Sequence, residues 1–190
     1  MATPTSLPAT FVAGNVLTAA QMNDLRGAFR ILQVVSTTKT DTFSASTDND
    51  GTPNDRFVDV TGLTATITPT SATSKVLVMV DITASSAGGI GATYRIERDG
   101  TPIGVATSTS NRQAATGAAT QGSAGVVASG SSTFLDSPAS TSALTYGVAV
   151  ANNESNASTI VVYVNRGQTD TDAAAQQRTT SSITLMEVSA

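Results

Sequence analysis

The sequence predicts an all-β protein: a jelly-roll-type β-sandwich that follows an extended N-terminal arm with one short helix. Many short segments alternate apolar residues with Ser and Thr, and loops rich in Ser, Gly, Ala and Asn separate them, a pattern typical of sandwiches and barrels. Only residues 18–29 show helical periodicity. Charged residues make up 13% of the chain, yet the hydrophobic share of 39% is enough for an ordered core. An immunoglobulin-like sandwich is the alternative for the same pattern.

The N-terminal region divides into an extended part and a helix. The first residues combine prolines and a glycine with small polar residues, which favours an arm that buries little surface by itself. Thr18 and Gln21 have the spacing of a capping box, so a helix is expected over residues 18–29. We therefore assign residues 1–33 to an attachment arm and residues 34–190 to the β-sandwich body.

The expected helix carries an apolar stripe that needs a partner. Met22, Leu25 and Phe29 fall on one helical face, and Leu17 is placed to pack against Met22 as a hydrophobic staple. A helix this short is marginal alone in water, so it must dock on its own body, on a sister subunit or on another protein. The candidate partner-binding residues are Leu17, Met22, Leu25, Arg26, Phe29 and Arg30.

The body is expected to contain about ten strands. Residues 63–68 alternate as a half-buried strand, and residues 75–84 are apolar on both faces, which places that strand in the middle of a sheet. Asp99 and Gly100 predict a hairpin turn within residues 93–107. The longest loop is expected at about residues 108–125, and such a loop is often functional. The remaining strands are expected at residues 31–36, 132–138, 144–150, 158–165 and 181–188.

The charge distribution argues against nucleic acid as a partner. The net charge is −4 and the isoelectric point is about 4.6. Residues 1–40 carry a net charge of +2 and the remainder −6, so a mildly basic arm precedes an acidic body. No apolar run approaches the roughly 18 residues of a membrane span, and the first residues lack the pattern of a signal peptide. These features predict a soluble product made in the cytoplasm, with no membrane partner.

Acidic clusters raise the question of a metal site. The chain has no cysteine and no histidine, which removes thiolate ligands, disulfides and the commonest general base. In residues 47–55, alignment of Gly51 with the glycine of a calcium loop puts Ser46 first and Phe57 last, so the match fails. A polar turn is the interpretation, with a cation site as the alternative. The same holds for the "DTD" run at residues 170–172.

We predict no catalytic residue, metal ligand or cofactor. A serine nucleophile would need Lys39 or Lys75 as its base, and Lys75 opens a strand as a solvated residue. A sugar-cleaving carboxylate pair usually has aromatic platforms, but aromatics are only 4% of the chain and Trp is absent. Arg95 and Glu97 share a strand face, which predicts an exposed ion pair or a cross-strand pair, with a subunit contact as the alternative.

Several stretches in order resemble a known group of proteins. They are "ITPTSATSKVLVMVDI", "YRIERDGTPIG", "FLDSPASTSALTYGVAV", "VYVNR" and "TSSITLMEV", together with "GNVLTAAQMNDLRGAF" near the start. The set resembles small structural proteins of tailed-bacteriophage virions, namely head decoration, minor tail and tail fibre-like proteins. The resemblance implies a jelly-roll sandwich that often assembles as a homotrimer, with no catalytic residues. Apolar residues on both faces of the strands also favour a trimer.

Three functions follow as hypotheses. In the first, a trimeric decoration or cement protein sits on the virion surface and docks on the major capsid protein through its arm. In the second, a minor tail protein or tail fibre docks on a tail or baseplate protein, and the loop at about 108–125 contacts the host. In the third, the chain is a non-viral adhesive module of the same architecture.

Overall fold

The computed structural model describes a two-layered β-sandwich. It describes residues 14, 16, 18, 19, 30–47, 56–89, 91–108, 110, 112–120, 126–153 and 159–189 of the 190-residue chain. Its elements are β1 (Ile31–Lys39), β2 (Phe43–Thr47), β3 (Val58–Ile67), β4 (Lys75–Ser86), η1 (Ala87–Gly89), β5 (Ala92–Arg98), β6 (Thr101–Ile103), β7 (Gly117–Ala119), β8 (Ala128–Asp136), β9 (Leu144–Asn152), β10 (Ile160–Val164) and β11 (Ser181–Val188).

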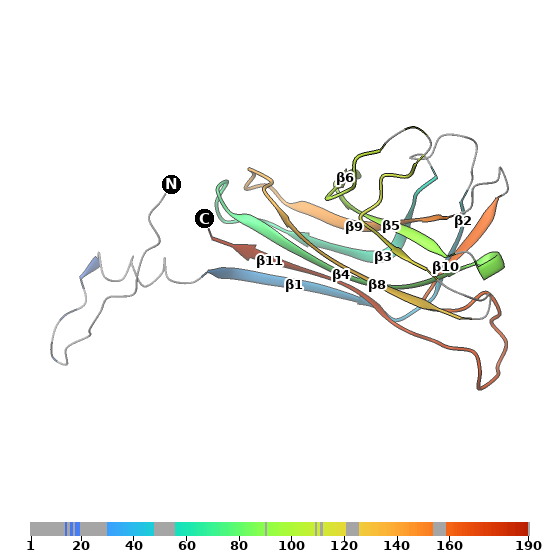
Figure 1. The fold of residues 1–190 in the computed structure, drawn as a ribbon. Coiled ribbons are helices and arrows are strands. Elements are labelled where there is room, and N and C mark those ends of the chain that lie inside the picture. Colours follow the sequence, from blue (N-terminus) through green and yellow to red (C-terminus); the bar gives the residue numbers. More distant parts are fainter. Residues whose placement is uncertain are drawn as a thin grey trace.

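The strand order is that of a jelly roll, which confirms the predicted fold class. Sheet A has the order β1-β11-β4-β8. β10 pairs with the C-terminal end of β4 on the same side as β11, and β2 pairs with β10. Sheet B has the order β3-β9-β5-β6, and β7 also pairs with β5. The chain passes between the sheets after β2, β3, β4, β7, β8 and β9, so sequence neighbours face each other across the core (Figure 1). An immunoglobulin-like sandwich pairs its strands in a different order.

The core lies between the sheets, and strand alternation builds it. In β3, Leu63, Ala65 and Ile67 are buried, whereas Thr64 and Thr66 face solvent, as the sequence pattern predicts. The prediction of a central strand at residues 75–84 is also confirmed, because β4 pairs with β8 on one side and with β11 and β10 on the other.

Two neighbouring lines of sheet A are each interrupted partway along. β1 and β2 form one line, with a break at residues 40–42 between them. β11 and β10 form the line beside it, with an excursion over residues 165–180 between them. The start of β1 and the end of β11 lie at one end of the sandwich, which we call the arm end. The 165–180 segment extends from the opposite, distal end (Figure 1).

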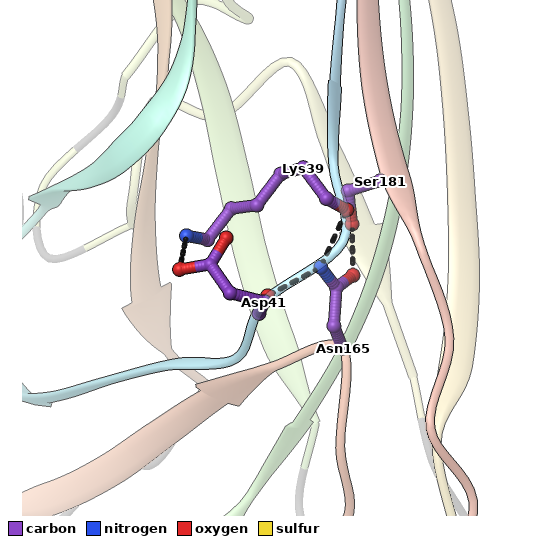
Figure 2. A network of polar contacts seen from close by, with 4 residues as sticks. All are labelled: Lys39, Asp41, Asn165 and Ser181. Carbon is purple, nitrogen blue, oxygen red and sulfur yellow. Dashed lines mark hydrogen bonds and ion pairs between the residues drawn. The ribbon is translucent and has the colours of Figure 1, made fainter.

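Asn165 closes the base of this excursion. Its Nδ2 donates to the carbonyl oxygens of Lys39 and Asp41 at 2.9 Å each, and its Oδ1 accepts from Ser181 Oγ at 2.6 Å (Figure 2). Its backbone N–H donates to the carbonyl of Thr83 at 2.9 Å. Asn165 adopts a φ of 63°, a left-handed conformation that asparagine tolerates better than most residues. The amide therefore joins both interrupted strands to the rest of sheet A.

Several local predictions can now be assessed. The hairpin is confirmed: β5 pairs with β6, and Asp99 and Gly100 have φ of 49° and 74°, as a type I′ turn requires. The expected loop at 108–125 was partly wrong, because β7 lies within it and pairs with β5. Almost all of the helix expected over 18–29 falls outside the described residues. Within it the structure describes Thr18 and Ala19, and both are exposed. β1 begins at Ile31, three residues before the boundary at residue 34, which stays a prediction.

Candidate functional site

Of the predicted attachment residues, the structure describes Arg30 alone, at the arm end of the body. Leu17, Met22, Leu25, Arg26 and Phe29 are outside the described residues, so their roles stay predictions. Arg30 is described and exposed. Its carbonyl oxygen accepts a hydrogen bond from the backbone N–H of Ser189 at 2.9 Å, which ties this arm residue to the end of β11.

The junction between the arm and the body is unusually apolar. Ile31, Leu32 and Val34 in β1 are all exposed, and the side chain of Val34 is 55% accessible. β1 is also an edge strand, because β11 is its only neighbour among the described strands. Proteins usually protect a sheet edge with charges or prolines, so an apolar edge is characteristic of a surface that another chain covers.

A buried carboxylate fixes this junction in place. Glu187 in β11 accepts hydrogen bonds from Gln33 Nε2 at 2.6 Å and from the N–H and Oγ1 of Thr70 at 2.7 Å each. Burial acts to raise the pKa of Glu187, but these hydrogen bonds outweigh it and hold the pKa below its ordinary value. Gln33 Nε2 also donates to the carbonyl of Thr68 at 2.7 Å. The root of the arm is therefore bound to β11 and to the loop that connects β3 with β4.

Sequence reasoning did not identify Glu187, although a signal was present. Ile183, Leu185 and Glu187 alternate along β11, and all three point into the sandwich. A carboxylate that continues an inward apolar series must find buried donors. The identity of those donors, Gln33 and Thr70, depends on pairings that no local pattern reveals.

A second buried carboxylate, Asp136, joins the two sheets at the C-terminal end of β8. Asp136 Oδ2 accepts from Arg98 Nη1 at 2.5 Å and from Tyr146 Oη at 2.7 Å, and Oδ1 accepts from the N–H of Ser137 at 2.9 Å. Burial and the bond to Asp136 raise the pKa of Tyr146. Because every oxygen of Asp136 already has a donor, this cluster is a structural link between β5, β8 and β9.

The pair of Arg95 and Glu97 lies on the outer face of sheet B. Arg95 Nε donates to Glu97 Oε1 at 2.6 Å, and its guanidinium lies 4.3 Å from the centre of the Phe57 ring. The predicted ion pair is confirmed, but the expectation that it is exposed is wrong, since Glu97 is buried. Burial raises the pKa of Glu97 against the lowering effect of Arg95, and the nearby Asp59 adds to the rise.

The described residues include no group of three metal-ligating side chains. The acidic residues of the 47–55 segment, Asp48, Asp50 and Asp55, lie outside them. In the "DTD" run, Asp170 pairs with Arg178 at 2.5 Å and with Arg166 at 3.4 Å, so two cations already balance its charge.

The two lysines considered as catalytic bases differ in environment. Lys39 is buried and its Nζ pairs with Asp41 Oδ2 at 2.8 Å, whereas Lys75 is exposed at the start of β4. In the described part of the chain, neither lysine has a serine hydroxyl as a hydrogen-bond partner. In the same part of the chain, no helix is long and apolar enough to cross a membrane.

Comparisons with known proteins identify no family for this chain. No protein-family model matches the chain, and no curated protein matches it. Among solved structures, the chain matches the VP2 subviral particle of infectious bursal disease virus with 15% identity and a TM-score of 0.38. The match covers 83% of this chain and 37% of the VP2 chain. A structure of the Gx strain of the same virus has 12% identity and a TM-score of 0.36, with 83% and 42% covered. The chain thus spans less than half the length of these viral proteins.

Proposed function

We propose that this chain is a non-enzymatic structural protein of a bacteriophage virion, and that it decorates the head as a homotrimer that docks through its N-terminal arm. One observation carries the proposal. Of the six large apolar side chains that are exposed among the described residues, four lie between residues 16 and 34: Val16, Ile31, Leu32 and Val34. The sequence resemblance to virion proteins supports the same assignment.

The arm has the properties of a docking segment. Met22, Leu25 and Phe29 continue the exposed apolar series toward the N-terminus at helical spacing. Full burial of these three side chains against a partner contributes about 6 kcal/mol before the cost of ordering the segment is subtracted. The net charge of +2 over residues 1–40 adds attraction to an acidic capsid surface. The rigid root at Gln33 and Glu187 then fixes where the body stands on the particle.

Deletion of residues 2–29 tests the arm directly. The truncated chain keeps Arg30, whose carbonyl bonds to Ser189, so the body should remain folded with an unchanged unfolding midpoint. It should fail to bind virions that lack the endogenous protein, as measured by co-sedimentation. Binding of the truncated chain at full-length levels contradicts the proposal.

A finer variant separates the stripe from the arm as a whole. Met22→Ser, Leu25→Ser and Phe29→Ser together should abolish co-sedimentation with virions. Ala20→Ser and Asn23→Ser, which lie off the stripe, form the matched control and should leave binding within about twofold of the wild type. Equal loss in both variants contradicts a role for the stripe.

A minor tail protein or tail fibre is the second candidate. The 165–180 segment projects from the distal end, so an arm docked on a tail or baseplate protein would leave it free to meet a host cell (Figure 1). Immunogold electron microscopy with antibody against residues 34–190 distinguishes the two locations. Gold over the whole head supports the decoration protein, and gold restricted to the tail replaces it with the tail protein.

A further inference from the structure

An apolar row crosses the outer face of sheet A from edge to edge. The register places Val34 of β1 beside Met186 of β11, Met186 beside Leu77 of β4, and Leu77 beside Leu135 of β8. All four side chains point away from the core, because their strand neighbours Val35, Leu185, Val76 and Asp136 point inward. We call these four residues the apolar row.

The row is most accessible at its two ends. Val34 is 55% exposed at the β1 edge and Leu135 is 46% exposed at the β8 edge, while Met186 and Leu77 between them are partly covered. Val188 and Met79 widen the apolar surface on either side of the row. A continuous apolar band across four strands is characteristic of an interface rather than of scattered exposed residues.

We infer that copies of this chain contact one another through the outer face of sheet A, with the β1 end of the row in one copy against the β8 end in the next. This inference rests on the homotrimer of the proposed function. Contact between two different ends of one row is heterologous, and such a contact closes into a ring when three copies are related by a threefold axis.

The size of the face favours a second copy over an unrelated protein. Four strands about 4.8 Å apart and seven residues at about 3.3 Å each give a face of about 400 Å². A standard interface uses about 800 Å² per partner, so this face alone suits only a weak contact. Copies whose arms hold them on one particle have a high effective concentration, and for them a weak contact is sufficient.

Charged residues bound the apolar row along β4. Lys75 and Asp81 both point outward from β4, on opposite sides of the apolar row, and both are exposed. Asp81 accepts a hydrogen bond from Ser131 of β8. In a ring about a threefold axis these two residues lie at the same level in every copy, so the contact is confined to the apolar row between them.

Thiol cross-linking tests this contact, because the chain contains no cysteine of its own. The full-length Val34→Cys/Leu135→Cys variant is treated with a short bis-maleimide at protein concentrations up to about 100 µM. We expect covalent species of two and three chains. Each single variant should give none, because residue 34 of one copy meets residue 135 of another.

The matched control places one thiol on the other sheet. Thr66→Cys/Leu135→Cys carries the same number of thiols, but Thr66 faces solvent on β3. Thermal unfolding of all variants verifies that the body is intact. The inference is overturned if the Val34/Leu135 pair gives no more product than the control, or if either single variant forms dimers as readily as the pair.

Two further results separate this inference from the proposed function. A monomeric product in which Met22→Cys is joined to Leu135→Cys within one chain overturns it, because the chain's own arm then covers the face. If cross-linking succeeds but the full-length chain does not bind virions, the contact stands and the docking proposal fails. If binding succeeds without cross-linking, the contact fails alone.

Discussion

The outer faces of the two sheets differ in polarity. On sheet A, the outward-pointing Val34, Leu77, Met186 and Leu135 are all apolar, and Val34 and Leu135 are exposed. On sheet B, Thr64, Thr66 and Thr145 face solvent, and the last two share a hydrogen bond at 3.0 Å.

The centre of sheet B is covered from within the chain. The small outward residues Ala149 and Ala151 of β9 are completely buried, and Arg95 of the neighbouring β5 lies beside Ala149 in the register and packs on the Phe57 ring. Sheet B therefore completes its own surface, whereas sheet A leaves its apolar surface for a partner. Changes on the two faces should have different consequences: stability on sheet B and association on sheet A.

We expect the largest loss of stability from a substitution on the inner face of sheet A. Asp136→Ala leaves Arg98 and the hydroxyl of Tyr146 without their acceptor and should lower the free energy of unfolding by about 4 kcal/mol. Urea denaturation measures the loss. Asp81→Ala is the control on the outer face of the same sheet and should cost less than about 0.5 kcal/mol. If the two variants lose similar free energy of unfolding, burial of the carboxylate between the sheets does not determine its contribution to stability.

Sheet B should respond to the loss of its ion pair. Arg95→Ala leaves Glu97 buried without its cation and uncovers Phe57, so we expect a loss of about 3 kcal/mol. The state of association, measured by sedimentation velocity, should not change. A shift in association without a loss of stability would reverse the roles that we assign to the two faces.

Acid should distinguish the two buried glutamates. The pKa of Glu187 is lowered by folding, so its stabilisation is present at neutral pH and is lost as the pH falls through the folded-state pKa. Glu187→Gln should therefore cost about 2 kcal/mol at pH 7, and the difference from the wild type should shrink toward pH 3.

Glu97 has the opposite sign, because folding raises its pKa. Protonation of Glu97 therefore stabilises the fold as the pH falls through that raised value. Relative to Glu97→Gln, the wild type should gain stability between pH 7 and pH 4, as measured by urea denaturation. Parallel pH profiles for the two glutamine variants would contradict the assignment.

The apolar row should show the smallest change in stability. Val34→Ser and Leu135→Ser together should alter the free energy of unfolding by less than about 1 kcal/mol, because both side chains are already largely solvated. The same double variant should lose self-association in sedimentation velocity. Thr64→Ser and Thr66→Ser on sheet B serve as controls and should retain it.

Local patterns in the sequence determined most of the secondary structure. The alternation of Leu63, Ala65 and Ile67 with threonines requires one buried face, and the Asp99-Gly100 pair suits the positive φ values of a tight hairpin. The position of β4 at the centre of its sheet followed from apolar residues on both of its faces. Such features depend on residues that are close together in the sequence, so local sequence patterns predict them.

Only the tertiary structure decided which distant residues meet. β7 has the sequence Gly-Ala-Ala, which carries no strand preference, and it is a strand because β5 offers a partner. Asn165 reads as a loop residue, yet it joins Lys39, Asp41 and Ser181. The apolar row is built from four strands between residues 34 and 186, and strand register alone aligns them. A shift of one residue in any of these strands would turn its row member into the core, which is why no local pattern contains the row.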